Sequence, residues 1–133
     1  MMNSRTIFEV SCAAVGGAMG FLFGAADGMF YALIAFIVLD YITGIIEAIM
    51  KKRLSSRIGF DGICKKAILF IIVALANIID VQIMGNTGGL LRSATISLFL
   101  ANEGLSILEN AANAGLPVPR VIIKVLEQFK KEN

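Results

Sequence analysis

The sequence predicts an all-α integral membrane protein with three to four transmembrane helices, four being favoured, and a C-terminal amphipathic cytoplasmic helix. Of its 133 residues, 57% are hydrophobic and only 17% are charged, which leaves too little polar surface for a soluble domain of this size. The segment 29–50 is almost continuously apolar. At about 1.5 Å of rise per residue, such a helix crosses a hydrocarbon core of about 30 Å.

Positive charges after this segment predict its orientation. Short loops rich in Lys and Arg stay in the cytoplasm, and the loop that follows carries Lys51, Lys52, Arg53, Arg57, Lys65 and Lys66. Four spans at about 7–26, 29–50, 67–84 and 90–112 place one cation at the N-terminus, six in this loop and four in the tail on the cytoplasmic side, and Arg92 alone outside. If the first segment does not insert, the same loop gives three spans with the N-terminus outside. We expect one membrane domain over residues 1–133.

The first span has glycines at every fourth position, namely Gly16, Gly20, Gly24 and Gly28. This spacing places them on one helix face, where another backbone can approach closely, so we predict a face for helix packing or oligomerisation. Two alternatives stay open. Glycine is common in transmembrane helices, and residues 24–26 resemble a signal-peptide cleavage site, although Glu9 and a single Arg5 argue against a signal peptide.

Three further segments complete the expected organisation. Residues 54–64 mix apolar and polar side chains and are too short to cross the membrane, so we expect them in the interface. Residues 84–89 have the composition of an outer turn. Pro117 and Pro119 break the fourth helix, and residues 119–131 have an apolar stripe opposite basic side chains, which predicts an amphipathic helix on the cytoplasmic surface.

Several polar residues fall inside the expected spans. Asp40 and Glu103 are expected near mid-bilayer, where a charge costs about 2.5–3.5 kcal/mol, whereas one polar contact between helices returns about 0.6 kcal/mol. We expect no cation at that depth, so these carboxyls are either protonated and hydrogen-bonded to neighbours such as Thr43 or Asn102, or they face water. The polar faces predict helices that pack together or line an aqueous path. Their members are Asp40, Thr43, Glu47, Asn77, Asp80, Asn102, Glu103, Ser106, Glu109 and Asn110.

The sequence offers no familiar catalytic arrangement. It has no histidine and only two cysteines, Cys12 and Cys64, which are expected to be small apolar fillers. We find no nucleophile-and-base pair, phosphate-binding loop or metal-ligand cluster. We therefore expect no enzyme activity, no cofactor and no nucleic-acid partner. A small ion channel or transporter stays open, because intramembrane acids mark ion pathways.

A resemblance to a known family predicts a more specific function. From about residue 30 to the end, the chain resembles the toxin secretion/phage lysis holin family in the order and spacing of its motifs. These are Leu39–Gly44, Lys52–Gly59, the Lys65–Lys66 pair, Asn102–Asn110 and Gly115–Pro119.

The resemblance implies a small protein of the bacterial cytoplasmic membrane of the host. Such proteins accumulate in the lipid and then assemble with copies of themselves, as homo-oligomers, into lesions. An endolysin, which is a cell-wall hydrolase, or a toxin leaves the cell through these lesions as cargo rather than as a stable partner.

Overall fold

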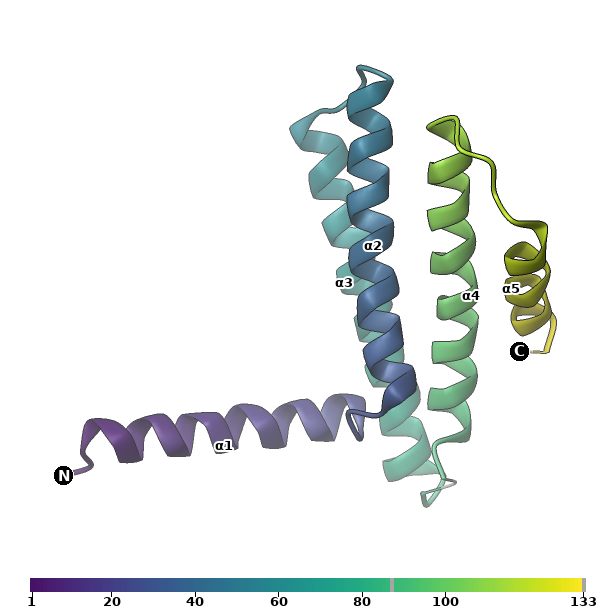
Figure 1. The fold of residues 1–133 in the computed structure, drawn as a ribbon. Coiled ribbons are helices and arrows are strands. Elements are labelled where there is room, and N and C mark those ends of the chain that lie inside the picture. Colours follow the sequence, from purple (N-terminus) through teal and green to yellow (C-terminus); the bar gives the residue numbers. More distant parts are fainter. Residues whose placement is uncertain (87, 133) are drawn as a thin grey trace.

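The computed structural model describes residues 1–86 and 88–132, and Thr87 of the expected outer turn lies outside them. The described residues form helices joined by short turns and include no strand (Figure 1). The helices are α1 (Ser4–Phe23), α2 (Gly28–Met50), α3 (Ser56–Ile78) with its π-helical extension η1 (Ile79–Ile83), α4 (Leu90–Asn113) and α5 (Arg120–Glu132). The predicted all-α class is confirmed.

Helices α2, α3 and α4 run side by side as a bundle (Figure 1). Helix α4 packs most extensively on α2 and also on α3, whereas α2 and α3 touch each other least. The buried apolar core is Phe30, Leu33, Ile37, Leu69, Val73 and Ile96. This core draws residues from α2, α3 and α4.

Among the described residues, three helical segments are long and apolar enough to cross a membrane: α1, α2 and α3 with η1. Helix α4 is not among them, and it carries Arg92, Glu103 and Glu109. With these three candidate spans, the protein is a multi-pass membrane protein. Helix α4 packs along α2, and its crossing of the membrane and the total number of spans stay predictions.

The first helix points away from the bundle. Helix α1 runs across the bundle axis (Figure 1) and has no buried residue. A Cβ added at Gly16, Gly20 or Gly28 would meet nothing within 4 Å, whereas one at Gly24 would lie 2.7 Å from the Asn77 Oδ1 atom. Gly24 also has a φ of +77°, a backbone conformation that side chains disfavour. Gly24 thus shapes the turn into α2, and the packing role of the other glycines stays a prediction about contacts between copies.

Side-chain caps explain where the helices begin. Asn3, Asp27 and Ser55 each accept a hydrogen bond from a backbone N–H of the first turn of α1, α2 and α3. Because Ser55 caps α3, the helix starts eleven residues before the expected third span. The place of residues 54–64 in the interface stays a prediction. Most of that segment is the first part of α3.

The C-terminal helix folds back. After a turn in which Gly115 has a φ of +95°, α5 packs on α4 and runs beside it (Figure 1). The structure therefore has a helix where the sequence predicts an amphipathic one. Its place on the cytoplasmic surface stays a prediction.

Candidate functional site

An ionic triad joins the three helices of the bundle, and each helix contributes one member. The Lys66 ammonium of α3 lies 2.5 Å from the Asp40 carboxylate of α2 and 2.5 Å from the Glu103 carboxylate of α4. Asp40 and Glu103 are buried, and Lys66 is mostly so. We call these three residues the Lys66 triad.

This triad corrects the prediction that no cation is available at the depth of Asp40 and Glu103. The charge pattern predicts that Lys66 is the last residue of a loop. In the structure α3 already begins at Ser56, so Lys66 lies well inside the helix and faces both carboxylates. The two acids therefore have a fixed cationic partner, and the expectation that they lack one is wrong.

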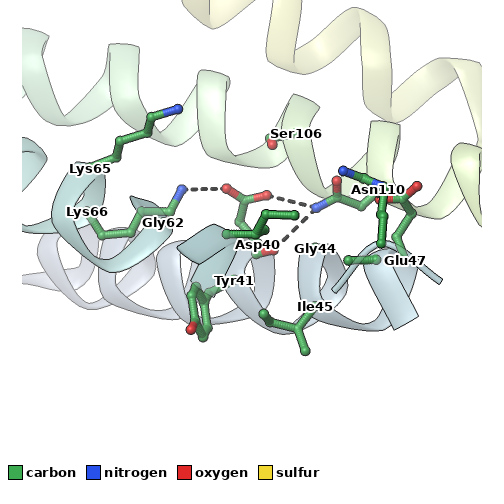
Figure 2. A pocket seen from close by; sticks show the side chains of 13 residues that line it. Asp40, Tyr41, Gly44, Ile45, Glu47, Gly62, Lys65, Lys66, Ser106 and Asn110 are labelled. Atoms are coloured by element: carbon green, nitrogen blue, oxygen red, sulfur yellow. Dashed lines mark hydrogen bonds and ion pairs between the residues drawn. The ribbon is translucent and has the colours of Figure 1, made fainter. Parts of the chain in front are cut away.

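The other Asp40 oxygen is held from α4. The Asn110 amide donates to Asp40 Oδ1 at 3.0 Å and to the Thr43 hydroxyl at 3.0 Å, while that hydroxyl donates to the Leu39 carbonyl at 2.8 Å. Figure 2 shows Lys66 and Asn110 approaching Asp40 from opposite sides. The carboxylate is thereby fixed between a cation and an amide. The sequence predicts Asn102 as a hydrogen-bonding neighbour of the buried carboxyls, whereas in the structure Asn110 donates to Asp40.

A cavity of about 230 Å³ opens beside the triad, between α2, α3 and α4. Asp40, Gly44, Lys66 and Ser106 line it (Figure 2), together with Glu47, which pairs with Arg53. Ionic and hydroxyl groups therefore face a space large enough for several waters. With both carboxylates ionised, the Lys66 triad carries one excess negative charge, and this space is where it can be solvated.

A second polar cluster holds the end of the bundle where α1 joins it. The Asn77 amide of α3 donates to the Phe21 and Leu22 carbonyls at 3.0 and 3.1 Å and so satisfies the end of α1. Asp80 accepts from the backbone N–H groups of Leu91 and Arg92 at 3.0 and 2.7 Å. Asp80 therefore caps α4 from η1. Asn77 and Asp80 are two of the predicted intramembrane polar residues, and in the structure they hydrogen-bond to the ends of α1 and α4.

Arg92 is the centre of this second cluster, and the sequence did not single it out as a site residue. Its guanidinium donates to the Phe23 carbonyl at 2.5 Å, to the Ala25 carbonyl at 2.7 Å and to Asp27 at 2.8 Å. It also lies over the Phe30 ring, 5.7 Å from the centroid. The hydrogen bond from Arg92 lowers the pKa of Asp27. The sequence does contain a signal for this contact: Arg92 is the lone cation expected outside, and Asp27 is expected on the same side.

The remaining predicted residues are more dispersed. Asn102 is half-buried and does not line the cavity, whereas Glu109 is exposed and faces the tail near Val118 and Ile123. Cys12 and Cys64 are exposed, so they do not fill the core. The cations Lys51, Lys52, Arg57 and Lys65 are exposed as well. Among the described residues, no group of three or more His, Cys, Asp or Glu side chains could hold a metal ion.

Comparison with known proteins gives a consistent result. The profile of the Bacteriophage holin family matches residues 17–131. A protein of Bacillus phage phi105 named "Probable holin" is 40% identical over 116 residues, which cover 87% of this chain and 84% of that protein. An uncharacterised protein of Listeria innocua is 42% identical over 123 residues, covering 92% and 86% of the two chains. No solved structure matches the chain.

Proposed function

Because the chain belongs to the bacteriophage holin family, we propose that it oligomerises in the cytoplasmic membrane of a bacterial host and forms lesions that release an endolysin or a toxin. The observation that carries this proposal is the family match over residues 17–131. Membrane lipid and further copies of the chain are its partners. The hydrolase or toxin is cargo.

The polar interior supports a subunit that is tolerated before it assembles. The two buried acids of the Lys66 triad are paired, and Arg92 and Asn77 satisfy the end of α1. Without its partner, each of these polar groups would raise the free energy of the subunit in lipid. A single subunit can therefore reside in the membrane without opening an aqueous path.

The surface supports assembly. Helix α1 is apolar, has no buried residue and extends away from the bundle (Figure 1). Packing between membrane helices depends on close contact and on small residues, which α1 offers at Gly16 and Gly20. Contacts that need a second copy form steeply as the concentration of subunits rises, and the lesion then appears abruptly.

The Lys66 triad beside its cavity also favours a second candidate, a small ion channel or transporter, because charged groups beside water-filled space are what ion pathways use. The size of the cargo separates the two functions. A channel passes its ion and retains folded proteins. A lesion passes both.

Inducible expression in bacteria tests the proposal, with membrane potential and release of a folded protein followed together. A co-expressed cell-wall hydrolase without an export signal reports release, and cells that express the hydrolase alone are the control. We expect growth to stop abruptly, with collapse of the potential and lysis at the same moment. A graded loss of potential without lysis at any expression level would support the channel and reject the lesion.

A further inference from the structure

Helix α5 is docked lengthwise on α4 rather than across its end (Figure 1). A Cβ built at Gly104 would lie 2.9 Å from Leu126 Cδ1, so the absence of a side chain at Gly104 is what admits Leu126. Nearer the turn, Ile123 lines a common pocket with Leu108 and Ala112 of α4. Residues later in α5 thus meet residues earlier in α4. The two helices run antiparallel.

The docked helix has two different flanks beside its contact face. Val121, Val125 and Phe129 are 72%, 50% and 47% exposed, and they form an apolar flank. At 100° per residue the exposed Arg120, Lys124, Glu127 and Lys131 fall together on the opposite flank. Ile123 and Leu126, which are less exposed, lie between the flanks and contact α4.

If α4 crosses the membrane as the sequence predicts, the docked position carries these flanks to membrane depth. Gly104 lies nine residues before the end of α4, which is about 14 Å along the helix axis. Lys131 lies five residues beyond Leu126, about 8 Å deeper. In a helix of 24 residues, about 36 Å long, Lys131 is therefore level with the middle of α4. A lysine there that faced lipid would cost about 2.5–3.5 kcal/mol and is too far from the helix end to reach the interface.

No single medium suits both flanks of the docked helix. Lipid suits the apolar flank and penalises the cations, whereas water suits the cations and penalises the exposed apolar side chains. A helix parallel to the bundle meets lipid on one side and water on the other only at an upright boundary between them. Such a boundary is the wall of an aqueous lesion.

We therefore propose that α5 stays docked upright on α4 in the assembled lesion, with its polar flank lining the water-filled lumen and its apolar flank against lipid. The inference rests on the proposed function, because it assumes that a lesion forms. The competing arrangement is a helix that leaves α4 and lies flat on the membrane surface.

A covalent lock tests whether docking and lesion formation coexist. In a chain carrying Cys12→Ser and Cys64→Ser, Gly104→Cys and Leu126→Cys place two thiols at the contact, and the second change removes the side chain that would obstruct the first. We expect a disulfide on oxidation in membranes, and we expect the locked chain to release the hydrolase as the reduced chain does. The matched control, Gly104→Cys with Leu126→Ala and Val125→Cys, removes the same obstruction, places its second thiol on the apolar flank and should not crosslink. Absence of the lock, or loss of release only in the locked chain, would overturn the proposal.

Depth measurements in lipid vesicles give an independent test. In the background that carries Cys12→Ser and Cys64→Ser, fluorophores attached singly to Val121→Cys and Phe129→Cys are quenched by phosphatidylcholine brominated at known acyl positions. An upright helix separates the two depths by about 12 Å, whereas a flat helix gives equal depths and rejects the proposal. A thiol at Lys131→Cys should react with a hydrophilic reagent in the upright helix. If the unlocked chain releases nothing from cells, the proposed function fails, while these depths still decide the position of α5.

Discussion

Lys66 of α3 donates to Asp40 of α2 across 2.5 Å and so joins the two bundle helices that touch each other least. A second link between the same helices is the hydrogen bond from the Tyr41 hydroxyl to the Gly59 carbonyl at 3.3 Å. Because the backbones of α2 and α3 approach each other closely at few positions, these polar links and the shared packing on α4 help to set the geometry of the bundle.

The first prediction concerns the loss of this cation. Lys66→Met leaves two buried carboxylates without their cation, and breaking a buried ion pair in this way costs about 3–5 kcal/mol. Because Lys66 is 22% exposed, we expect a loss near the lower end of that range. Asp40→Asn and Glu103→Gln each leave Lys66 one carboxylate and should cost less. Thermal unfolding in detergent measures how strongly each of the three variants destabilises the protein. The time at which the membrane potential collapses should shift most for the most destabilised variant.

Lys65→Met is the matched control, because Lys65 is the exposed neighbour of Lys66 and lies outside the triad. It removes the same charge from α3 without unpairing a buried acid. Equal effects of the two lysine variants would mean that the net charge of this part of α3 matters and that the triad does not.

The second prediction follows from the pair of Arg92 and Asp27. Arg92 lowers the pKa of Asp27 below its ordinary value of 3.8, so the pair stabilises the fold above that value and its contribution is lost as the pH falls through the lowered pKa. In a chain carrying Cys12→Ser and Cys64→Ser, spin labels at Val15→Cys on α1 and Ile72→Cys on α3 should report a constant distance distribution between pH 7 and pH 5, which broadens only below about pH 4.

Asp27→Asn serves as the control for that measurement. Asparagine still caps α2 but lacks the carboxylate, so the distribution should be broader at neutral pH and should lose its acid transition. A transition near pH 6 in the parent chain would show that another group controls the attachment of α1.

The third prediction concerns orientation. The excess of cations around Arg53 and Arg57 predicts that this end of the bundle is cytoplasmic, and the exposed native Cys64 lies on the same part of α3. A membrane-impermeant thiol reagent should therefore label Cys64 only from inside, and Asn86→Cys only from outside in a chain that also carries Cys12→Ser and Cys64→Ser. In the same background, labelling of Ser4→Cys from inside indicates that α1 crosses the membrane, and labelling from outside indicates that it does not. Exclusive labelling of position 86 from inside would reverse the topology.

Local patterns were sufficient to predict most helices but not their pairing. The apolar runs and the Pro117–Pro119 break give the extent of α2 and α4 to within a few residues. The start of α3 was missed because the cations of 57–66 suggested a loop, whereas the cap at Ser55 and one exposed charged stripe allow a helix. That error also concealed the pairing of Lys66, since the register between α3 and α2 depends on where α3 begins.

The candidate site was predicted in part. Asp40, Thr43 and Asn110 were expected on polar helix faces and do meet. The directions of α1 and α5 could not be read from periodicity, because they depend on contacts between distant residues: Arg92 with Phe23 and Gly104 with Leu126. Hydropathy describes each helix separately and carries no information on these contacts.

The last prediction separates assembly from folding by means of the glycines of α1. A Cβ at Gly16 or Gly20 would meet nothing within 4 Å in the described chain, and leucine favours a helix over glycine by about 0.5–1 kcal/mol. Gly16→Leu with Gly20→Leu should therefore leave the unfolding temperature in detergent unchanged or raised, yet alter oligomer formation and the time of potential collapse, because only contacts between copies are blocked. Gly24→Leu should instead lower the unfolding temperature, since Gly24 has a φ of +77° and a Cβ there would lie 2.7 Å from Asn77. Unchanged timing in the double leucine variant at equal expression would show that this face of α1 meets lipid rather than another copy.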